Sequence, residues 1–269
     1  MYLVGAIFWD PNPIAFTVPL VNHPILWYSL FFALGFFLAY TFVHQRLIKE
    51  GIARPVLDAM TWYLFFGMLL GARLGHVLFY EWSYFQAHPH KIFLTWEGGL
   101  ASHGAAIGIL LALWLFWRKY KPSTFLKLLD LVCVAVAIAA GFIRVGNGFN
   151  QEILGVPSNL PWAVFFGHPA DPYSTQPCHP VQFYEAAFYF ITAIGLWIAS
   201  LRKNCTPGSI AGSFFVLIFT FRLAIDSLKL PQASVEPDFL YMGQLLSIPF
   251  ILLGLFLFFR SQTPTKTCR

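Results

Sequence analysis

Three arginines lie where a strongly apolar chain rarely carries charge: Arg73, Arg144 and Arg222 fall inside or at the ends of hydrophobic stretches. An arginine near the centre of a membrane helix costs about 2.5–3.5 kcal/mol on insertion scales, and such residues usually line a polar interior. A guanidinium offers a planar fork of donors that suits a phosphate. Snorkelling or a bond to a helix end would explain one such residue, whereas three together predict a polar cavity that receives an anion.

The segment GFIRVGNGFNQEILG, residues 141–155, carries the densest group of polar side chains. Arg144 and Asn147 are three residues apart, so a continuing helix would present both on one face. Gly146 and Gly148 permit a close approach of backbone or ligand within lipid. Asn150 and Glu152 follow at the outer edge, and we expect the segment to bring polar groups to the depth of a lipid head group.

A histidine opens another apolar stretch in TWEGGLASHGAAIG, residues 95–108. His103 would lie at the N-terminal end of that helix, where the helix dipole disfavours imidazolium. The ring would then stay neutral and could accept a proton, while the alternative is a histidine that anchors an interface. In FRLAIDSLK, Arg222 and Asp226 are four residues apart, which suits an ion pair within one helix.

Two further clusters accompany these residues. HPVQFYEAAFY opens a helix with His179, Gln182, Tyr184 and Glu185. NHPILWYSL places Tyr28 near the start of the first helix, where an aromatic belt at the membrane surface is the default explanation.

The elements that must position these residues are membrane helices. Of 269 residues 58% are hydrophobic and only 11% charged, well below the charge of a typical soluble domain. A spanning helix needs about 20 mostly apolar residues. The sequence offers seven such stretches, near 24–43, 56–80, 100–117, 128–148, 180–201, 209–228 and 242–260. We predict an all-α polytopic membrane protein, a single domain over residues 1–269, with seven transmembrane helices.

The distribution of Lys and Arg predicts the orientation of these spans. Twelve of the seventeen basic residues lie in the loops HQRLIKEGIARP, RKYKPSTFLK and RKN and in the C-terminal tail, which we assign to the cytoplasm. The loops 81–99, 149–179 and 229–241 then face outward, as does the N-terminus, and all the polar clusters fall in the outer half. Basic residues scattered over short loops do not indicate nucleic-acid binding.

Other features add little chemistry. Cys133, Cys178, Cys205 and Cys268 show neither a CxxC nor a metal-ligand spacing, and we expect no metal site, at HPH 88–90 or elsewhere. The N-terminal stretch lacks the basic start and unbroken apolar run of a signal peptide, so we expect no cleavage. Loop 149–179 is rich in Gly, Pro and Asn and contains WAVFF, which could be a strand or a membrane-lying segment.

The chain resembles the prolipoprotein diacylglyceryl transferases of the bacterial cytoplasmic membrane. RVGNGFNQEILG is closely similar to the signature loop of that family and retains Arg144, Gly146, Asn147, Asn150, Glu152 and Gly155. GARLGHVLFY, WEGGLASHGAAIG, HPVQFYEA and MGQLLSIP resemble further family blocks in the same order. The resemblance extends from about Tyr28 to Pro249, and the fold that it implies is a seven-helix bundle with a periplasmic head region.

The resemblance implies transfer of the diacylglyceryl group of phosphatidylglycerol to the lipobox cysteine of a prolipoprotein, with release of glycerol 1-phosphate. No cofactor or metal is implied, and we expect a monomer. His103, Arg144 and Arg222 are the expected catalytic residues: His103 as the base, or as a group that only positions the phosphate or a water, and the arginines as phosphate ligands. Expected substrate-binding residues are Tyr28, Arg73, Asn147, Asn150, Glu152, Gly155 and Asp226.

Four positions depart from the family pattern. Ile143 and Gln151 stand where glycine is usual, Ile218 where a tyrosine can occur, and Asp226 where glutamate is common. Two other classes of function compete with an enzyme. A lipid transporter would be expected to show inverted repeats or broken helices, of which the sequence has no sign. A structural scaffold would leave the convergence of His103, Arg144 and Arg222 unexplained.

Overall fold

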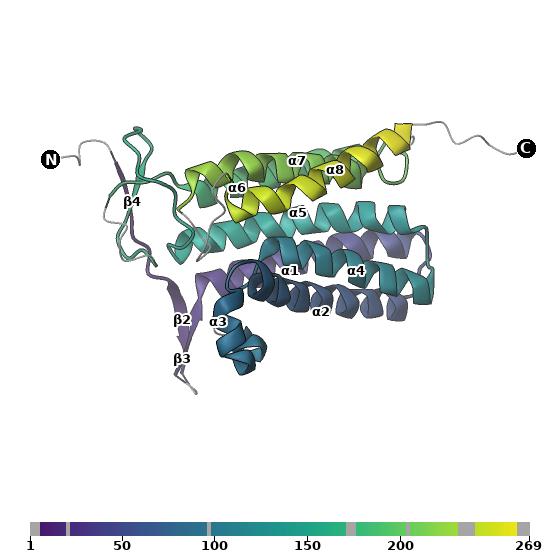
Figure 1. The fold of residues 1–269 in the computed structure, drawn as a ribbon. Helices are drawn as coiled ribbons and strands as arrows, with labels where there is room; N and C mark the ends of the chain where they lie inside the picture. The colour runs from purple at the N-terminus through teal and green to yellow at the C-terminus, as the bar shows by residue number, and fades with distance from the viewer. Residues whose placement is uncertain are drawn as a thin grey trace, which may run out of the picture.

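A computed structural model of the chain describes residues 6–19, 22–95, 98–170, 176–202, 205–230 and 240–262. The fold is predominantly helical (Figure 1). The long helices are α1 (Trp27–Lys49), α2 (Arg54–Phe79), α4 (Ser102–Tyr120), α5 (Phe125–Phe149), α6 (Val181–Ser200), α7 (Ser209–Ile225) and α8 (Met242–Gln262). Shorter elements are the helices α3 (Trp82–Ala87), η1 (Pro89–Phe93) and η3 (Asp226–Leu228) and the strands β1 (Ile7–Trp9), β2 (Ile14–Val18), β3 (His23–Leu26) and β4 (Val164–Phe166).

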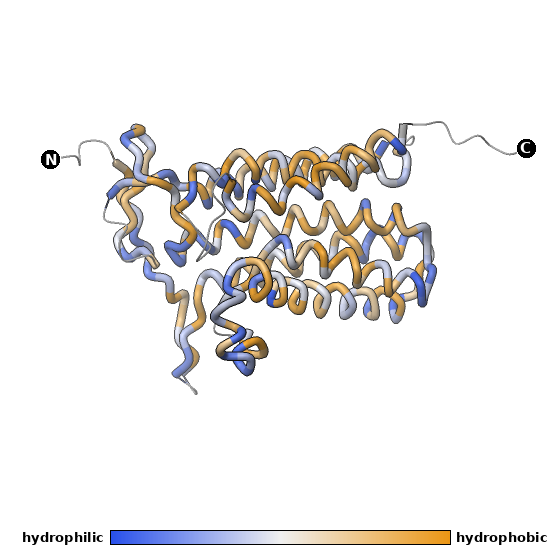
Figure 2. Tube along the Cα trace, viewed as in Figure 1, coloured by the Kyte–Doolittle hydropathy of each residue, from blue (hydrophilic) through white to orange (hydrophobic). Residues whose placement is uncertain are grey.

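Among the described residues, six helices are long and apolar enough to cross a membrane: α1, α2, α5, α6, α7 extended by η3, and α8. Six of the seven predicted spans are therefore confirmed as helices long and apolar enough to cross a membrane. The helix outside this set is α4, which begins with Ser102 and His103 and ends with Arg118 and Lys119. Figure 2 shows hydrophobic residues along the helices and hydrophilic residues gathered toward both ends of the bundle.

Helix α5 occupies the middle of the bundle. It packs against α1, α6 and α7, and its first half supplies a large share of the buried apolar core. Asp130 on α5 accepts hydrogen bonds from the backbone nitrogens of Gly208 and Ala211, both at 2.7 Å. These are orphan donors at the start of α7, so a carboxylate from one helix caps its neighbour and sets the height of α7 along α5.

Helices α2 and α4 form a second unit held by backbone contact. Gly67, Gly71 and Gly75 on α2 face Gly104 and Gly108 on α4. A Cβ on Gly71 would lie 2.4 Å from the carbonyl oxygen of Gly104, so only glycine permits this separation. Small residues one turn apart are a usual means of helix association in lipid, where apolar burial gives no driving force between helices.

The strands lie together at one end of the bundle, opposite the C-terminal end of α8 (Figure 1). β2 and β3 form an antiparallel hairpin, and β1 pairs in parallel with β4. The WAVFF run of loop 149–179 is thus a strand rather than a membrane-lying segment. The indole nitrogen of Trp9 donates to the carbonyl of Gly148 at 2.9 Å, which ties the N-terminal strand to the end of α5.

Candidate functional site

Glu185, at the start of α6, is the centre of a buried charged cluster and has no solvent-exposed surface. Its carboxylate forms an ion pair with Arg144 Nε at 3.1 Å and another with Lys229 Nζ at 3.0 Å. Arg222 lies 3.8 Å away, and the hydroxyl of Tyr189 donates to the same carboxylate at 3.1 Å. Groups from α5, α6, α7 and the segment after η3 therefore meet at one carboxylate, and we call these five residues and Asp226 the charged cluster.

Lys229 enters the cluster because its backbone pairs with the segment that follows α5. Gly155 and Lys229 form an antiparallel bridge, flanked by a bond from Leu230 N to Leu154 O at 3.1 Å. A side chain on Gly155 would not fit, since its Cβ would lie 2.4 Å from the carbonyl oxygen of His179. Burial lowers the pKa of Lys229 from its ordinary value.

The predicted ion pair between Arg222 and Asp226 is wrong. Helix α7 ends at Ile225 and Asp226 begins a 3₁₀ turn, but the backbone nitrogen of Asp226 still donates to Arg222 O, so the two residues keep their helical spacing. Asp226 instead pairs with Lys229 at 2.6 Å, while Arg222 points toward Glu185. The four-residue separation was read correctly, but each side chain has another partner.

The predicted face of α5 is present. Arg144 donates from Nη1 to Asn147 Oδ1 at 3.1 Å, and Asn147 donates to Glu152 Oε1 at 2.7 Å. Gln182 on α6 donates to the backbone oxygen of Glu152 at 2.8 Å. A chain of hydrogen bonds thus links the charged cluster to the more exposed Glu152.

Tyr28, the second residue of α1, lies against this chain. A Cβ on Gly146 would be 2.9 Å from the Tyr28 ring and 3.1 Å from its Cα, so the glycine lets α1 and α5 touch. Tyr28 is therefore half-buried against α5 at Gly146, the residue before Asn147, rather than in a belt facing lipid alone.

His103 lies on the other side of Arg222, near the start of α4. Its Nε2 is 3.1 Å from Ser247 Oγ on α8, and its ring packs against Phe219 and Phe250, which stack on each other. Only 1% of its surface is exposed. The fold thus brings His103 and both arginines to one end of the bundle.

Within the described residues, five fully buried side-chain atoms have no hydrogen-bond partner, and all belong to this region. They are His103 Nδ1, Asn150 Oδ1, Gln182 Oε1, Glu185 Oε2 and Arg222 Nε, although Glu185 Oε2 does take part in the ion pair with Arg144. Buried polar groups are almost always satisfied, so each exception calls for an explanation. A cluster of both donors and acceptors fits a site that a polar substrate completes.

Arg73 is not brought to this region. Its guanidinium donates to the backbone oxygens of Ile92, Gly98, Gly99, Lys91 and Leu94. These bonds occupy the donors of the side chain, which also lies over the ring of Phe85. Arg73 therefore organises the loop between α2 and α4.

The loop after α5 is held by the N-terminal segment. Gln151 adopts a left-handed φ of 52°, which is uncommon for a residue with a side chain. Its amide donates to Asp10 at 3.1 Å and accepts from His168 N at 2.7 Å. The hydrogen bond from His168, followed by that from Gln151, lowers the pKa of Asp10. These contacts hold Gln151 where the family usually has glycine.

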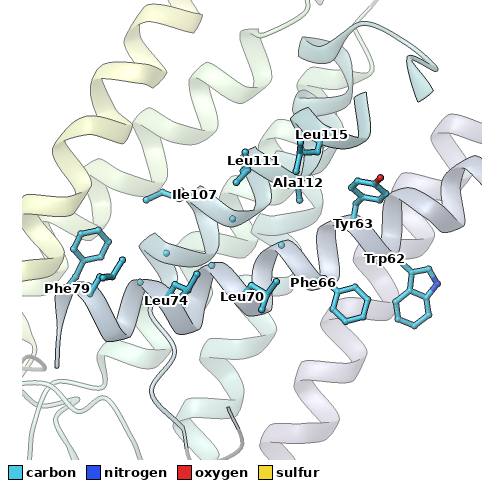
Figure 3. Close-up of a pocket in the computed structure, with 16 residues that line it drawn as sticks. Trp62, Tyr63, Phe66, Leu70, Leu74, Phe79, Ile107, Leu111, Ala112 and Leu115 are labelled. Atoms are coloured by element: carbon cyan, nitrogen blue, oxygen red, sulfur yellow. The ribbon is translucent and has the colours of Figure 1, made fainter. Parts of the chain in front are cut away.

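A separate apolar groove of about 810 Å³ follows the contact of α2 with α4 (Figure 3). Its labelled side chains include Phe66, Leu70, Leu74, Ile107, Leu111 and Leu115. It contains none of the residues of the charged cluster, and its surface suits hydrocarbon.

Several residues of the site were missed from the sequence. Glu185 was noticed only as one member of a polar cluster, Lys229 only as a basic residue of an outer loop, and Ser247 only within MGQLLSIP. The unusual number of polar residues in HPVQFYEA, between two apolar stretches, was the signal available for Glu185. For Lys229 the available signal was a lone lysine among outer loops otherwise nearly free of basic residues.

Comparison with known proteins identifies the family of this chain. Residues 13–260 match the family described as prolipoprotein diacylglyceryl transferase. A phosphatidylglycerol–prolipoprotein diacylglyceryl transferase of Porphyromonas gingivalis is 41% identical, with 97% of this chain and 96% of the relative aligned. Proteins of the same name from Tolumonas auensis and Protochlamydia amoebophila are 41% and 34% identical, with 93% and 95% of this chain aligned. The chain therefore belongs to the prolipoprotein diacylglyceryl transferase family.

Proposed function

We propose that the charged cluster, together with His103 and the Arg144–Asn147–Glu152 chain, is where this transferase moves a diacylglyceryl group from phosphatidylglycerol to a prolipoprotein cysteine. The observation that carries the proposal is the set of buried, unpartnered polar atoms on His103, Asn150, Gln182 and Arg222. They lie among three cations at one end of an otherwise apolar bundle, where a lipid head group enters most easily.

The reaction that we propose is a substitution at carbon. The cysteine sulfur attacks the glyceryl carbon that carries the phosphate ester, and a carbon–sulfur bond forms as the carbon–oxygen bond breaks. The electron pair of that bond leaves with the oxygen of glycerol 1-phosphate. The thiol proton passes to His103, because the thiolate is the effective nucleophile.

Arg144 and Arg222 stabilise the charge that develops on the departing phosphate. Both guanidiniums face Glu185, so a phosphate that enters competes with this carboxylate for them. Lys229 keeps Glu185 paired when the arginines turn to the substrate. Donors already held in place within a medium of low dielectric stabilise such charge more strongly than in water.

The remaining residues orient the glycerol part of the head group. Tyr28, Asn147 and Asn150 supply neutral polar groups, and Glu152 accepts from Asn147. Gly155 and Asp226 act by placing Lys229. Arg73 is not included, since its donors are used by the loop after α2.

We also propose the arrangement in the membrane. Helix α4 is a seventh span, because it packs along α2 through glycines although its ends are polar. The end with the strands is a periplasmic head and the C-terminus is cytoplasmic, in line with the basic loops. The protein acts as a monomer in the bacterial inner membrane on prolipoproteins that carry a lipobox.

The test is transfer by the purified protein in detergent, with phosphatidylglycerol and a synthetic lipobox peptide. We expect the peptide to gain a diacylglyceryl mass on its cysteine, with release of an equal amount of glycerol phosphate. Arg144→Ala should lower kcat/KM by at least about 10²-fold, as expected for loss of a charge-stabilising group. Arg118→Ala, at the opposite end of α4, is the matched control and should keep full activity.

Two results would contradict the proposal. Normal turnover by a folded Arg144→Ala protein would remove the charged cluster from the reaction. Binding of phosphatidylglycerol without transfer by the wild-type protein would indicate a carrier instead of an enzyme.

A further inference from the structure

Ser247 lies one helical turn after the start of α8 and makes two contacts with its single hydroxyl group. Its Oγ is 2.7 Å from the backbone oxygen of Gly243 and 3.1 Å from His103 Nε2. A backbone oxygen can only accept, so the first contact uses the only proton of the hydroxyl. The distances agree, since about 2.7 Å is usual for O–H···O and 3.1 Å lies within the range for N–H···O.

The second contact must then be a bond in which His103 Nε2 carries the proton and Ser247 Oγ accepts it. A neutral imidazole has one protonated nitrogen, so Nδ1 is left with a free lone pair. The Nδ1 atom is fully buried and has no hydrogen-bond partner among the described residues. The geometry therefore determines which of the two nitrogens is able to receive a proton.

The surroundings favour the neutral ring. His103 is packed against Phe219 and Phe250, and Arg222 and Lys229 act on it as nearby positive charges. Burial and like charge both oppose a second proton on the free ring.

Gly243 also brings Asp226 near this ring. A Cβ there would lie 2.2 Å from Asp226 Oδ2 and 3.8 Å from His103 Cε1. Asp226 is paired with Lys229, and its carboxylate lies near enough to this ring to stabilise an imidazolium once a proton has arrived.

We propose that Ser247 is a positioning residue that holds His103 in the Nε2-protonated form, so that Nδ1 is the atom that accepts the thiol proton. The inference rests on the proposed function of this site. In the transfer step the S–H bond breaks, the proton moves to Nδ1, and the sulfur electron pair forms the bond to the glyceryl carbon. Throughout the step, Ser247 keeps its own proton and donates it in the hydrogen bond to the backbone oxygen of Gly243. It touches neither substrate.

The first measurement is the ¹⁵N NMR spectrum of the protein labelled at histidine, in detergent, without substrate. His103→Gln identifies the two signals of His103. We expect Nε2 at the shift of a protonated nitrogen and Nδ1 at that of an unprotonated one. The reverse assignment in the wild-type protein would overturn the proposal, and this readout does not depend on activity.

The second measurement compares Ser247→Ala and Ser247→Thr in the same spectrum and in the transfer assay. In Ser247→Ala we expect the ratio of the Nε2-protonated to the Nδ1-protonated tautomer of His103 to fall by about tenfold, which is the factor that one neutral hydrogen bond contributes. We expect kcat to fall in proportion to the measured fraction of protein that keeps Nε2 protonated, with KM for phosphatidylglycerol unchanged, and Ser247→Thr to restore both. A kcat that does not follow this measured fraction would remove Nδ1 from the reaction.

Ser261→Ala is the matched control. Ser261 lies on the same helix and donates to the backbone oxygen of Phe258 at 2.7 Å, so it makes the same kind of bond far from His103. This variant should change neither the spectrum nor kcat. A wild-type protein with the expected spectrum but no transfer activity would refute the proposed function and leave the assignment of the ring nitrogens in place.

Discussion

The charged cluster and the contact of α2 with α4 solve the same problem in opposite ways. In lipid, helices gain nothing by hiding apolar surface from one another, so another interaction must hold them. Helices α2 and α4 have glycine at their contact positions, so that their backbones pack directly against each other at Gly67, Gly71 and Gly108. Helices α5, α6 and α7 keep large charged side chains and join them at Glu185.

The difference shows which region is free to react. A backbone contact between glycines has one geometry and offers no side chains that could bind a ligand, and the groove beside it is apolar. The charged cluster holds three cations against two carboxylates, with polar atoms among the described residues still unpartnered. The first arrangement is complete by itself, whereas we propose that an anion completes the second.

The largest effect is expected from Glu185→Ala, which removes the carboxylate at the centre of the charged cluster. This variant tests whether charged contacts hold α5, α6 and α7 together. Arg144, Arg222 and Lys229 would be left buried without their shared carboxylate, and breaking a buried pair typically costs about 3–5 kcal/mol. We expect transfer activity to be lost and the midpoint of thermal unfolding in detergent to fall. Glu50→Ala, which removes the exposed pair with Lys127, is the control and should change neither. A fully stable Glu185→Ala protein would show that the cations do not depend on this carboxylate.

A smaller effect is expected from Gly67→Ala, which tests the other region. The added Cβ would lie 2.7 Å from the carbonyl oxygen of Gly108, and overpacking of this kind costs about 1–3 kcal/mol. We expect a lower unfolding temperature but an unchanged kcat for the folded fraction, because this end of the contact is away from both His103 and the charged cluster. Gly195→Ala on α6, where nothing lies within 4 Å of the added atom, is the matched control and should leave the unfolding temperature unchanged. A loss of kcat at full stability would mean that the two regions are coupled.

The smallest effect is expected from Asp10→Asn, which loosens the loop that leads from α5 into the cluster. The pKa of Asp10 is lowered by its bonds to His168 and Gln151, so its contribution is present above the ordinary pKa of aspartate. It is lost as the pH falls through the lowered value. We expect faster amide exchange in residues 164–170 of the variant at pH 7, and a difference between the two proteins that disappears once the pH falls below the lowered pKa of Asp10. A difference that does not change with pH would contradict this account.

Much of the helical framework was predictable because membrane helices are determined by local composition. The expected spans agree with the observed helices to within three residues at each end, except that α1 continues six residues further, to Lys49. Arg144 and Asn147 meet at their predicted spacing. The family was also recognisable from short ordered motifs, and the comparisons confirm it. These features depend on neighbours along the chain, where periodicity is a reliable guide.

The expectations that failed concern side chains whose partners differ from those that the spacing along the chain suggests. Arg222 and Asp226 keep their helical spacing but do not pair, because Asp226 pairs with Lys229 and Arg222 faces Glu185. The donors of Arg73 reach backbone oxygens 18 to 26 residues further along the chain, which no spacing rule describes.

The sequence by itself therefore determined that this chain is a membrane protein, where its helices run, which family it belongs to and which polar residues lie at their ends. Only the tertiary structure decided that Glu185 is the centre of the charged cluster, that Lys229 reaches it across 44 residues, and that Ser247 lies within hydrogen-bond distance of His103. The physical reason is that hydrophobicity acts locally and is summed along a helix. A buried charge is compatible with lipid only through specific partners, and these are supplied by whichever helices the fold brings beside it.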